Sequence, residues 1–191
     1  MGIYLVSVSS QDWSPAGEDG HGDIASALNA ELARRGLPPY EAKGGPGAPD
    51  WFEEKLSPSM DGFDALCRER LTPDERDALL GWSLLVPFAL AEAVPLPVAS
   101  SYTDETLVVG APYVLGLAER LAGAIGLPLD LIPATFRALE LTAWFLDGAA
   151  DKAATTRPGP WADDLSSAFY TAVYLRAAQY SLRHGCAMTY S

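Results

Sequence analysis

The sequence predicts an α+β fold, a single domain spanning residues 1–191 in which a small, largely antiparallel sheet is covered on one face by about five or six helices. Short apolar segments typical of strands cluster in the N-terminal and middle parts of the chain. Segments with helical periodicity lie between and after them. The length of 191 residues suits one domain with a substantial core.

The last long helix, expected over residues 161–185, is predicted to be the centre of the fold. Its apolar positions form two neighbouring stripes, so other elements should pack on at least two of its sides. The first stripe comprises Leu165, Ala168, Phe169, Ala172 and Val173. Gly185 is expected to end the helix in the left-handed conformation.

In the N-terminal third, residues 3–8 are expected to form the first strand. Asp23 is expected to cap a helix that stops at Gly36, just before Leu37-Pro38. Residues 9–22 and 43–50 are rich in turn formers and are expected to be flexible loops.

In the middle of the chain, Thr72-Pro73-Asp74-Glu75 has the residues of a capping box, and Gly81 should end that short helix. Residues 82–90, 96–102 and 106–109 are expected to be strands. Pro87 should sit at an end or a bulge, because proline has no N–H to donate within a sheet.

Towards the C-terminus, Pro112 is expected to start an amphipathic helix that stops at Gly126. The segment 136–146 is ambiguous between strand and helix, and its apolar spacing favours a helix. Residues 147–160 are expected to be a flexible loop.

The chain is strongly acidic, with a formal net charge of -12. This charge would repel a phosphate backbone, so nucleic acid is disfavoured as a partner. A basic protein partner is electrostatically allowed. The simpler interpretation is that the acidity serves solubility alone.

The two cysteines, Cys67 and Cys186, have no metal-site spacing and are expected to be free thiols in a reducing compartment. The pair His21 and Asp23 lacks an identifiable third ligand, so neither a metal nor a cofactor is predicted. The N-terminus lacks the pattern of a signal peptide, and the longest apolar run is too short to span a bilayer. A cytoplasmic location is therefore expected.

Arg176 is the unusual residue of the last helix, because it lies where the first apolar stripe should continue. A partly buried guanidinium needs a carboxylate, carbonyls or a bound anion as its partner. A structural ion pair is the simpler interpretation, and a site for an anionic ligand is the alternative.

For catalysis, the nearest approach to a nucleophile and a base is the pair Cys186 and His184. A helix-terminal charge and a packed thiol explain the same two residues without catalysis. The familiar nucleotide-binding, hydrolase and metalloprotease motifs are missing from the sequence. The enzyme question therefore stays open, and the sequence favours a protein that is not an enzyme.

Two functional classes remain. The first is an acidic binding or accessory protein of the immunity type, which captures a basic protein partner through exposed carboxylates and aromatic side chains. The aromatic candidates are Trp13, Trp51, Tyr102 and Trp161. The second class is a small-molecule binder or enzyme with a pocket around Arg176. The candidate ligand-binding residues are Arg176, Tyr174, Tyr180 and Tyr102.

The opening segment MGIYLVSV and the closing segment YLRAAQYSLRHGCAMTY resemble small uncharacterised proteins of high-GC actinobacteria. The ten arginines against three lysines suit such a genome. Neither segment contains a catalytic motif, so the resemblance implies no activity.

Overall fold

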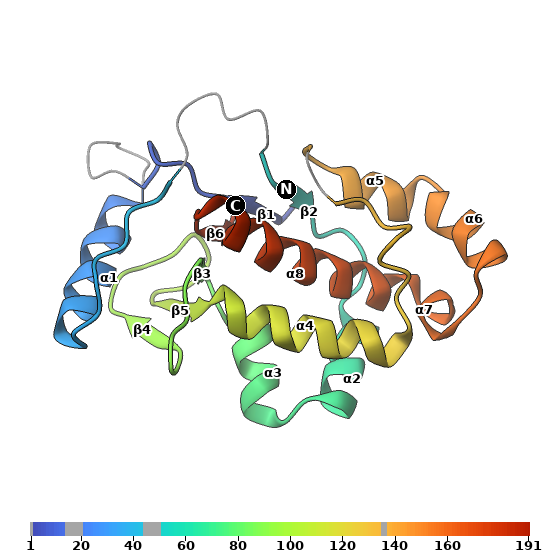
Figure 1. Ribbon diagram of the computed structural model, residues 1–191, viewed down its shortest axis with the longest axis horizontal. Coiled ribbons are helices and arrows are strands. Elements are labelled where there is room, and N and C mark those ends of the chain that lie inside the picture. Colours follow the sequence, from blue (N-terminus) through green and yellow to red (C-terminus); the bar gives the residue numbers. More distant parts are fainter. Residues whose placement is uncertain (1, 14–20, 44–50, 135–136) are drawn as a thin grey trace.

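The computed structural model describes residues 2–13, 21–43, 51–134 and 137–191. These residues form a six-stranded sheet in the order β2-β1-β6-β3-β5-β4, together with eight helices (Figure 1). The strands are β1 (Tyr4–Ser7), β2 (Glu53–Lys55), β3 (Leu84–Val86), β4 (Val94–Leu96), β5 (Thr106–Gly110) and β6 (Met188–Tyr190). The helices are α1 (Gly22–Arg34), α2 (Asp61–Arg70), α3 (Pro73–Leu80), α4 (Ala111–Ile125), α5 (Glu140–Leu146), α6 (Ala149–Thr156), α7 (Pro160–Asp163) and α8 (Leu165–His184).

The sheet is largely antiparallel, as the sequence predicts. Among the six described strands, β3 and β5 form the one parallel pair, with Leu85 opposite Val109. The pairs β1/β2, β1/β6, β3/β6 and β4/β5 are antiparallel. Because β6 runs antiparallel to both of its neighbours, β1, β3 and β5 all point the same way. Their carboxyl ends therefore meet at one end of the sheet.

Helix α8 is the central helix, and most of its residues are buried. Asp164 caps its first turn by accepting a hydrogen bond from the backbone N–H of Ser167 at 3.0 Å. Gly185 ends it with φ of 65°, a left-handed conformation in which glycine has no steric cost. The predicted start at Trp161 is wrong, because residues 160–163 form the separate turn α7.

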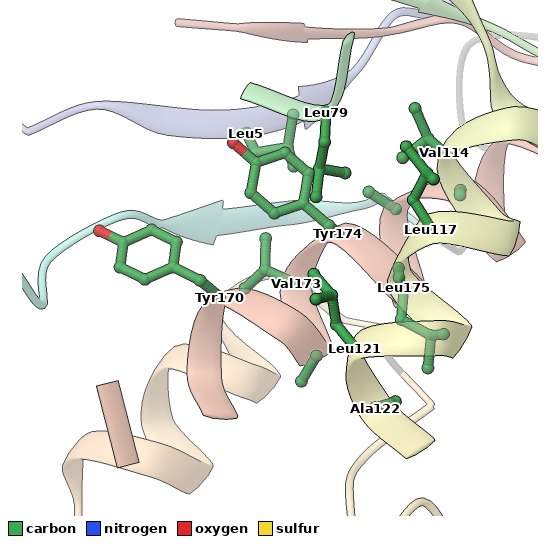
Figure 2. Packing of buried hydrophobic residues seen from close by; sticks show 14 of the residues in the cluster. Leu5, Leu79, Val114, Leu117, Leu121, Ala122, Tyr170, Val173, Tyr174 and Leu175 are labelled. Atoms are coloured by element: carbon green, nitrogen blue, oxygen red, sulfur yellow. The ribbon is translucent and has the colours of Figure 1, made fainter. Parts of the chain in front are cut away.

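The first layer of helices packs on the sheet face that we call the α8 face. Helices α4 and α8 lie side by side across it (Figure 1). Figure 2 shows Leu121 and Ala122 of α4 next to Leu175 of α8, with Tyr174 directed towards Leu79. These residues belong to one buried cluster that includes Leu5, Leu85, Val109 and Met188 of the sheet.

The opposite face, which we call the α1 face, carries a second buried cluster. From the sheet it takes Leu84, Val86, Val94, Leu96 and Val108. Helix α1 supplies Ile24, Ala25, Leu28 and Leu32, and the loops add Trp13 and Tyr40. Adjacent residues of one strand, such as Leu84 and Leu85, thus enter different clusters, as the pleat requires. The prediction of cover on one face only is therefore incomplete.

Several local predictions are confirmed. Thr72 and Glu75 form the capping box of α3, with both reciprocal hydrogen bonds present. Gly126 ends α4 in a left-handed conformation. Cys67 and Cys186 are buried, free thiols. Pro87 follows directly after β3, outside the paired residues.

Other local predictions are wrong. Residues 147–160 are not a loop, because they contain α6 (Ala149–Thr156). This helix begins after Gly148, whose φ is 87°, and it buries Ala150. Residues 97–102 are not a strand, since β4 ends at Leu96. The expected loop at Gly44–Pro49 lies outside the described residues.

Both edges of the sheet are protected from further pairing. At the β4 edge, the exposed Pro95 has no N–H to offer a neighbouring strand. At the β2 edge, the N-terminal end of α5 lies against the strand. Leu139 donates its N–H to the Glu53 carbonyl at 2.6 Å, and the Lys55 N–H donates to Thr142 Oγ1 at 3.0 Å.

Candidate functional site

Arg176 is half-buried, and its guanidinium hydrogen-bonds to backbone carbonyls. Nε donates to Pro133 at 3.0 Å, while one terminal nitrogen donates to Leu129 and Ile132, both at 3.0 Å. The other terminal nitrogen donates to the amide oxygen of Gln179 at 2.9 Å. Burial lowers the pKa of Arg176, and the nearby charge of Arg183 adds to this effect. These contacts secure the 129–133 segment to α8 without needing a ligand.

The three tyrosines predicted to join Arg176 each have other surroundings of their own. Tyr174 lies in the buried α8-face cluster, where its hydroxyl is 3.1 Å from that of Tyr190. Tyr180 packs against Phe52. Tyr102 is 56% exposed in the loop between β4 and β5. The role of these residues in ligand binding stays a prediction.

His184 and Cys186 lie near each other in sequence but have different surroundings. The His184 ring stacks on Tyr180, with ring centroids 4.2 Å apart. Its buried Nε2 has no hydrogen-bond partner among the described residues. Burial raises the pKa of the Cys186 thiol to about 12. Such a thiol stays protonated at neutral pH, which is unfavourable for a nucleophile.

Two of the four aromatic side chains predicted to be exposed are buried. Trp13 is 6% exposed because it packs edge-on against Tyr40 in the α1-face cluster. Trp161 is 1% exposed, and its indole nitrogen donates to the Arg157 carbonyl at 3.1 Å. Trp51, at 39%, and Tyr102 are exposed as expected.

Glu54 is a fully buried carboxylate that the sequence did not reveal. Its two oxygens accept hydrogen bonds from the N–H groups of Leu141 and Thr142 at 2.9 and 2.8 Å, and from the Thr142 hydroxyl at 2.8 Å. The carboxylate therefore lies at the N-terminus of α5, where backbone N–H groups are otherwise unpaired. Burial raises its pKa despite these donors. Glu54 shares a strand face with Phe52, a weak signal that this position points inward.

A hollow of about 300 Å³ lies between α2, α4 and the start of α8. Two carboxylate residues, Glu69 and Asp164, line it together with the apolar Leu66 and Ile125. Gly62 allows α2 to approach α8 closely, because a Cβ at this position would collide with a carboxylate oxygen of Asp164. We call this the acidic hollow.

A larger hollow, of about 390 Å³, lies on the α1 face. The loop after β1, helix α1 and the extended segment 40–42 form its walls. The lining residues are Ser10, Trp13, Ala25, Ser26, Asn29, Tyr40, Glu41 and Ala42. We call this the aromatic hollow. It shares Trp13 and Tyr40 with the buried cluster of that face, so it reaches into the layer between helix and sheet.

Comparisons with protein-family models, curated proteins and solved structures give no match. Within the described segments, the structure contains no helix with the length and apolarity needed to cross a bilayer. The same segments bring together no group of three or more His, Cys, Asp or Glu side chains suited to a metal ion. Function is therefore inferred from the two hollows and from the charge of the chain.

Proposed function

We propose that this protein is an acidic binding or accessory protein, of the immunity type, that recognises a positively charged protein partner. The acidic hollow is the observation that carries the proposal. Glu69 and Asp164 offer carboxylates beside the apolar surface of Leu66 and Ile125. A lysine or arginine side chain has an apolar stem and a charged tip, and it complements both parts of this surface.

The charge of the whole chain supports the same partner. A net charge of -12 attracts a basic protein and accelerates its association at low salt. It repels nucleic acid, which we do not propose as a partner. The free thiols fit a reducing compartment, so the proposal places the protein in the cytoplasm.

The proposal assigns no catalysis to the protein. Its candidate nucleophile, Cys186, is buried with a pKa raised to about 12, and its candidate base, His184, stacks on Tyr180. The alternative of a ligand pocket around Arg176 has less support, because the guanidinium nitrogens already donate hydrogen bonds to three backbone carbonyls and to the amide oxygen of Gln179.

The test is a pull-down from a lysate of the source cells, with the charge reversal Glu69→Arg as the decisive variant. Glu69 is well exposed, and its ion pair joins it to the adjacent Arg70, so the substitution should leave the fold intact. The matched control is Glu105→Arg, which changes the net charge equally at an exposed position away from the acidic hollow.

We expect the unmodified protein to retain a basic protein at low salt, and salt to weaken that retention. Glu69→Arg should abolish the retention, whereas Glu105→Arg should preserve most of it. Equal retention by both variants would show that the acidic hollow is not the binding surface. Retention that salt does not weaken would argue against a charge-driven partner.

A further inference from the structure

The aromatic hollow is a second candidate site, independent of the acidic hollow. Its volume of about 390 Å³ falls in the range of pockets that hold small organic molecules. One wall is α1, where Ala25, Ser26 and Asn29 present small or short side chains. The segment 40–42 forms another wall, and Trp13 also lines the hollow.

The aromatic wall is held in place by contacts from three parts of the chain. Asn29 donates from its amide to the Tyr40 carbonyl at 3.0 Å and accepts from the Tyr40 N–H at 2.7 Å. The Tyr40 hydroxyl donates to the Gly185 carbonyl at 3.1 Å. The ring of Trp13 meets that of Tyr40 edge-on, with centroids 5.1 Å apart. A fixed wall reduces the ordering that a ligand would have to impose.

The polar groups of the aromatic hollow favour a positively charged ligand. Glu41 is exposed and is the charged member among the described lining residues, which include no Lys, Arg or His. Ser26 donates its hydroxyl proton to the Gly22 carbonyl at 2.8 Å, so its oxygen can still accept from a ligand N–H. Aromatic faces attract cations as well. An anion would meet no cationic side chain in the part of the lining that the structure describes, and the overall charge of the chain would repel it.

We propose that the aromatic hollow binds a small organic cation with a flat apolar body, of the arylalkylamine class. The flat body lies against Trp13 and Tyr40, and the ammonium group faces the Glu41 carboxylate. This inference goes beyond the protein partner proposed above, and either proposal can fail without the other.

The first test uses matched pairs of probes that differ in charge. Tryptamine and tyramine are compared with indole-3-acetate and 4-hydroxyphenylacetate by amide and indole NMR titration of the full chain. We expect the amines to shift the Trp13 indole N–H and the Ala42 amide, with a Kd of about 1 mM or tighter. The acids should bind at least about tenfold more weakly. Equal shifts from amines and acids, or no shift at these two groups, would overturn the proposal.

The second test uses variants of the hollow. Glu41→Gln should weaken amine binding by about three- to fivefold, as expected for the loss of an exposed ion pair. Ser26→Phe should abolish it, because the ring fills the hollow from an exposed position that the fold tolerates. Glu105→Gln removes the same charge away from the hollow and should leave binding unchanged. If Glu41→Gln and Glu105→Gln weaken binding equally, or Ser26→Phe binds normally, the proposed site is wrong.

Discussion

The two faces of the sheet are covered in different ways. The α8 face receives several helices, and α4 and α8 cross it side by side (Figure 1). In the described part of the chain, the α1 face receives one helix of 13 residues and the extended segment around Tyr40. On the α8 face, the acidic hollow lies where helix ends meet. On the α1 face, the larger hollow lies alongside the helix and reaches the buried aromatic residues.

The two faces differ in how densely helices cover them. Helices packed side by side fill the space above a sheet to high density. One helix beside an extended chain covers a sheet less completely, and the aromatic hollow lies at that place among the described residues.

Large-to-small substitutions should show the largest difference in stability between the two faces. Leu175 and Leu28 are both fully buried, the first between α8 and α4 and the second between α1 and the sheet. We expect Leu175→Ala to lower the free energy of unfolding by about 3 to 5 kcal/mol, and Leu28→Ala by about 2 to 3 kcal/mol, because α1 can move inward to reduce the cavity. Urea unfolding of both variants measures the difference. An equal or larger loss of stability for Leu28→Ala would show that the α1 face is packed as tightly as the α8 face.

Glu54 should contribute strongly to the attachment of α5 at the β2 edge of the sheet. Glu54→Leu leaves the donors of Leu141 and Thr142 without their acceptor, so we expect a loss of about 2 to 4 kcal/mol in urea unfolding. Glu54→Gln keeps one acceptor oxygen and serves as the control, with a smaller loss expected. If Glu54→Leu is as stable as the unmodified protein, the carboxylate is not needed to attach α5.

Substitution of Arg176 should lower the stability by less than substitution of Glu54. Arg176→Met removes the donors that join α8 to the carbonyls of the 129–133 segment, and we expect a loss of about 1 to 3 kcal/mol. Arg68→Met is the control: Arg68 is exposed and pairs with Asp64, so its loss should stay within about 0.5 kcal/mol. A gain in stability for Arg176→Met would instead indicate that the guanidinium waits for an anionic ligand.

The titration of Glu54 should change the free energy of unfolding by the smallest amount. Burial raises the pKa of Glu54 above its ordinary value of 4.5, so the folded protein holds this proton more tightly than the unfolded chain does. The corresponding stability is present below pH 4.5 and is lost as the pH rises through the folded-state pKa. The stability of the unmodified protein relative to Glu54→Gln should therefore fall as the pH rises from acid towards neutral. Urea unfolding at several pH values measures this difference in stability. If the relative stability of the unmodified protein rose with pH, the prediction would be wrong.

The features that depend on neighbouring residues could be predicted from the sequence alone. The capping box at Thr72 and Glu75, the left-handed stops at Gly126 and Gly185, and the apolar stripes of α8 all lie within a few turns of chain. The α+β class follows from the order of these segments. Local hydrogen bonding and periodicity need no distant partner, so they can be recognised without the fold.

The features that join distant segments follow from three-dimensional packing. Strands β2 and β6 have three residues each, too few to show alternation, and β6 is defined by its pairing with β1 from the other end of the chain. Trp13 is buried because Tyr40 packs on it, and Arg176 is satisfied by carbonyls more than 40 residues away in sequence. Burial and hydrogen-bond partners are set by three-dimensional packing, which the identity of a residue and its neighbours does not specify.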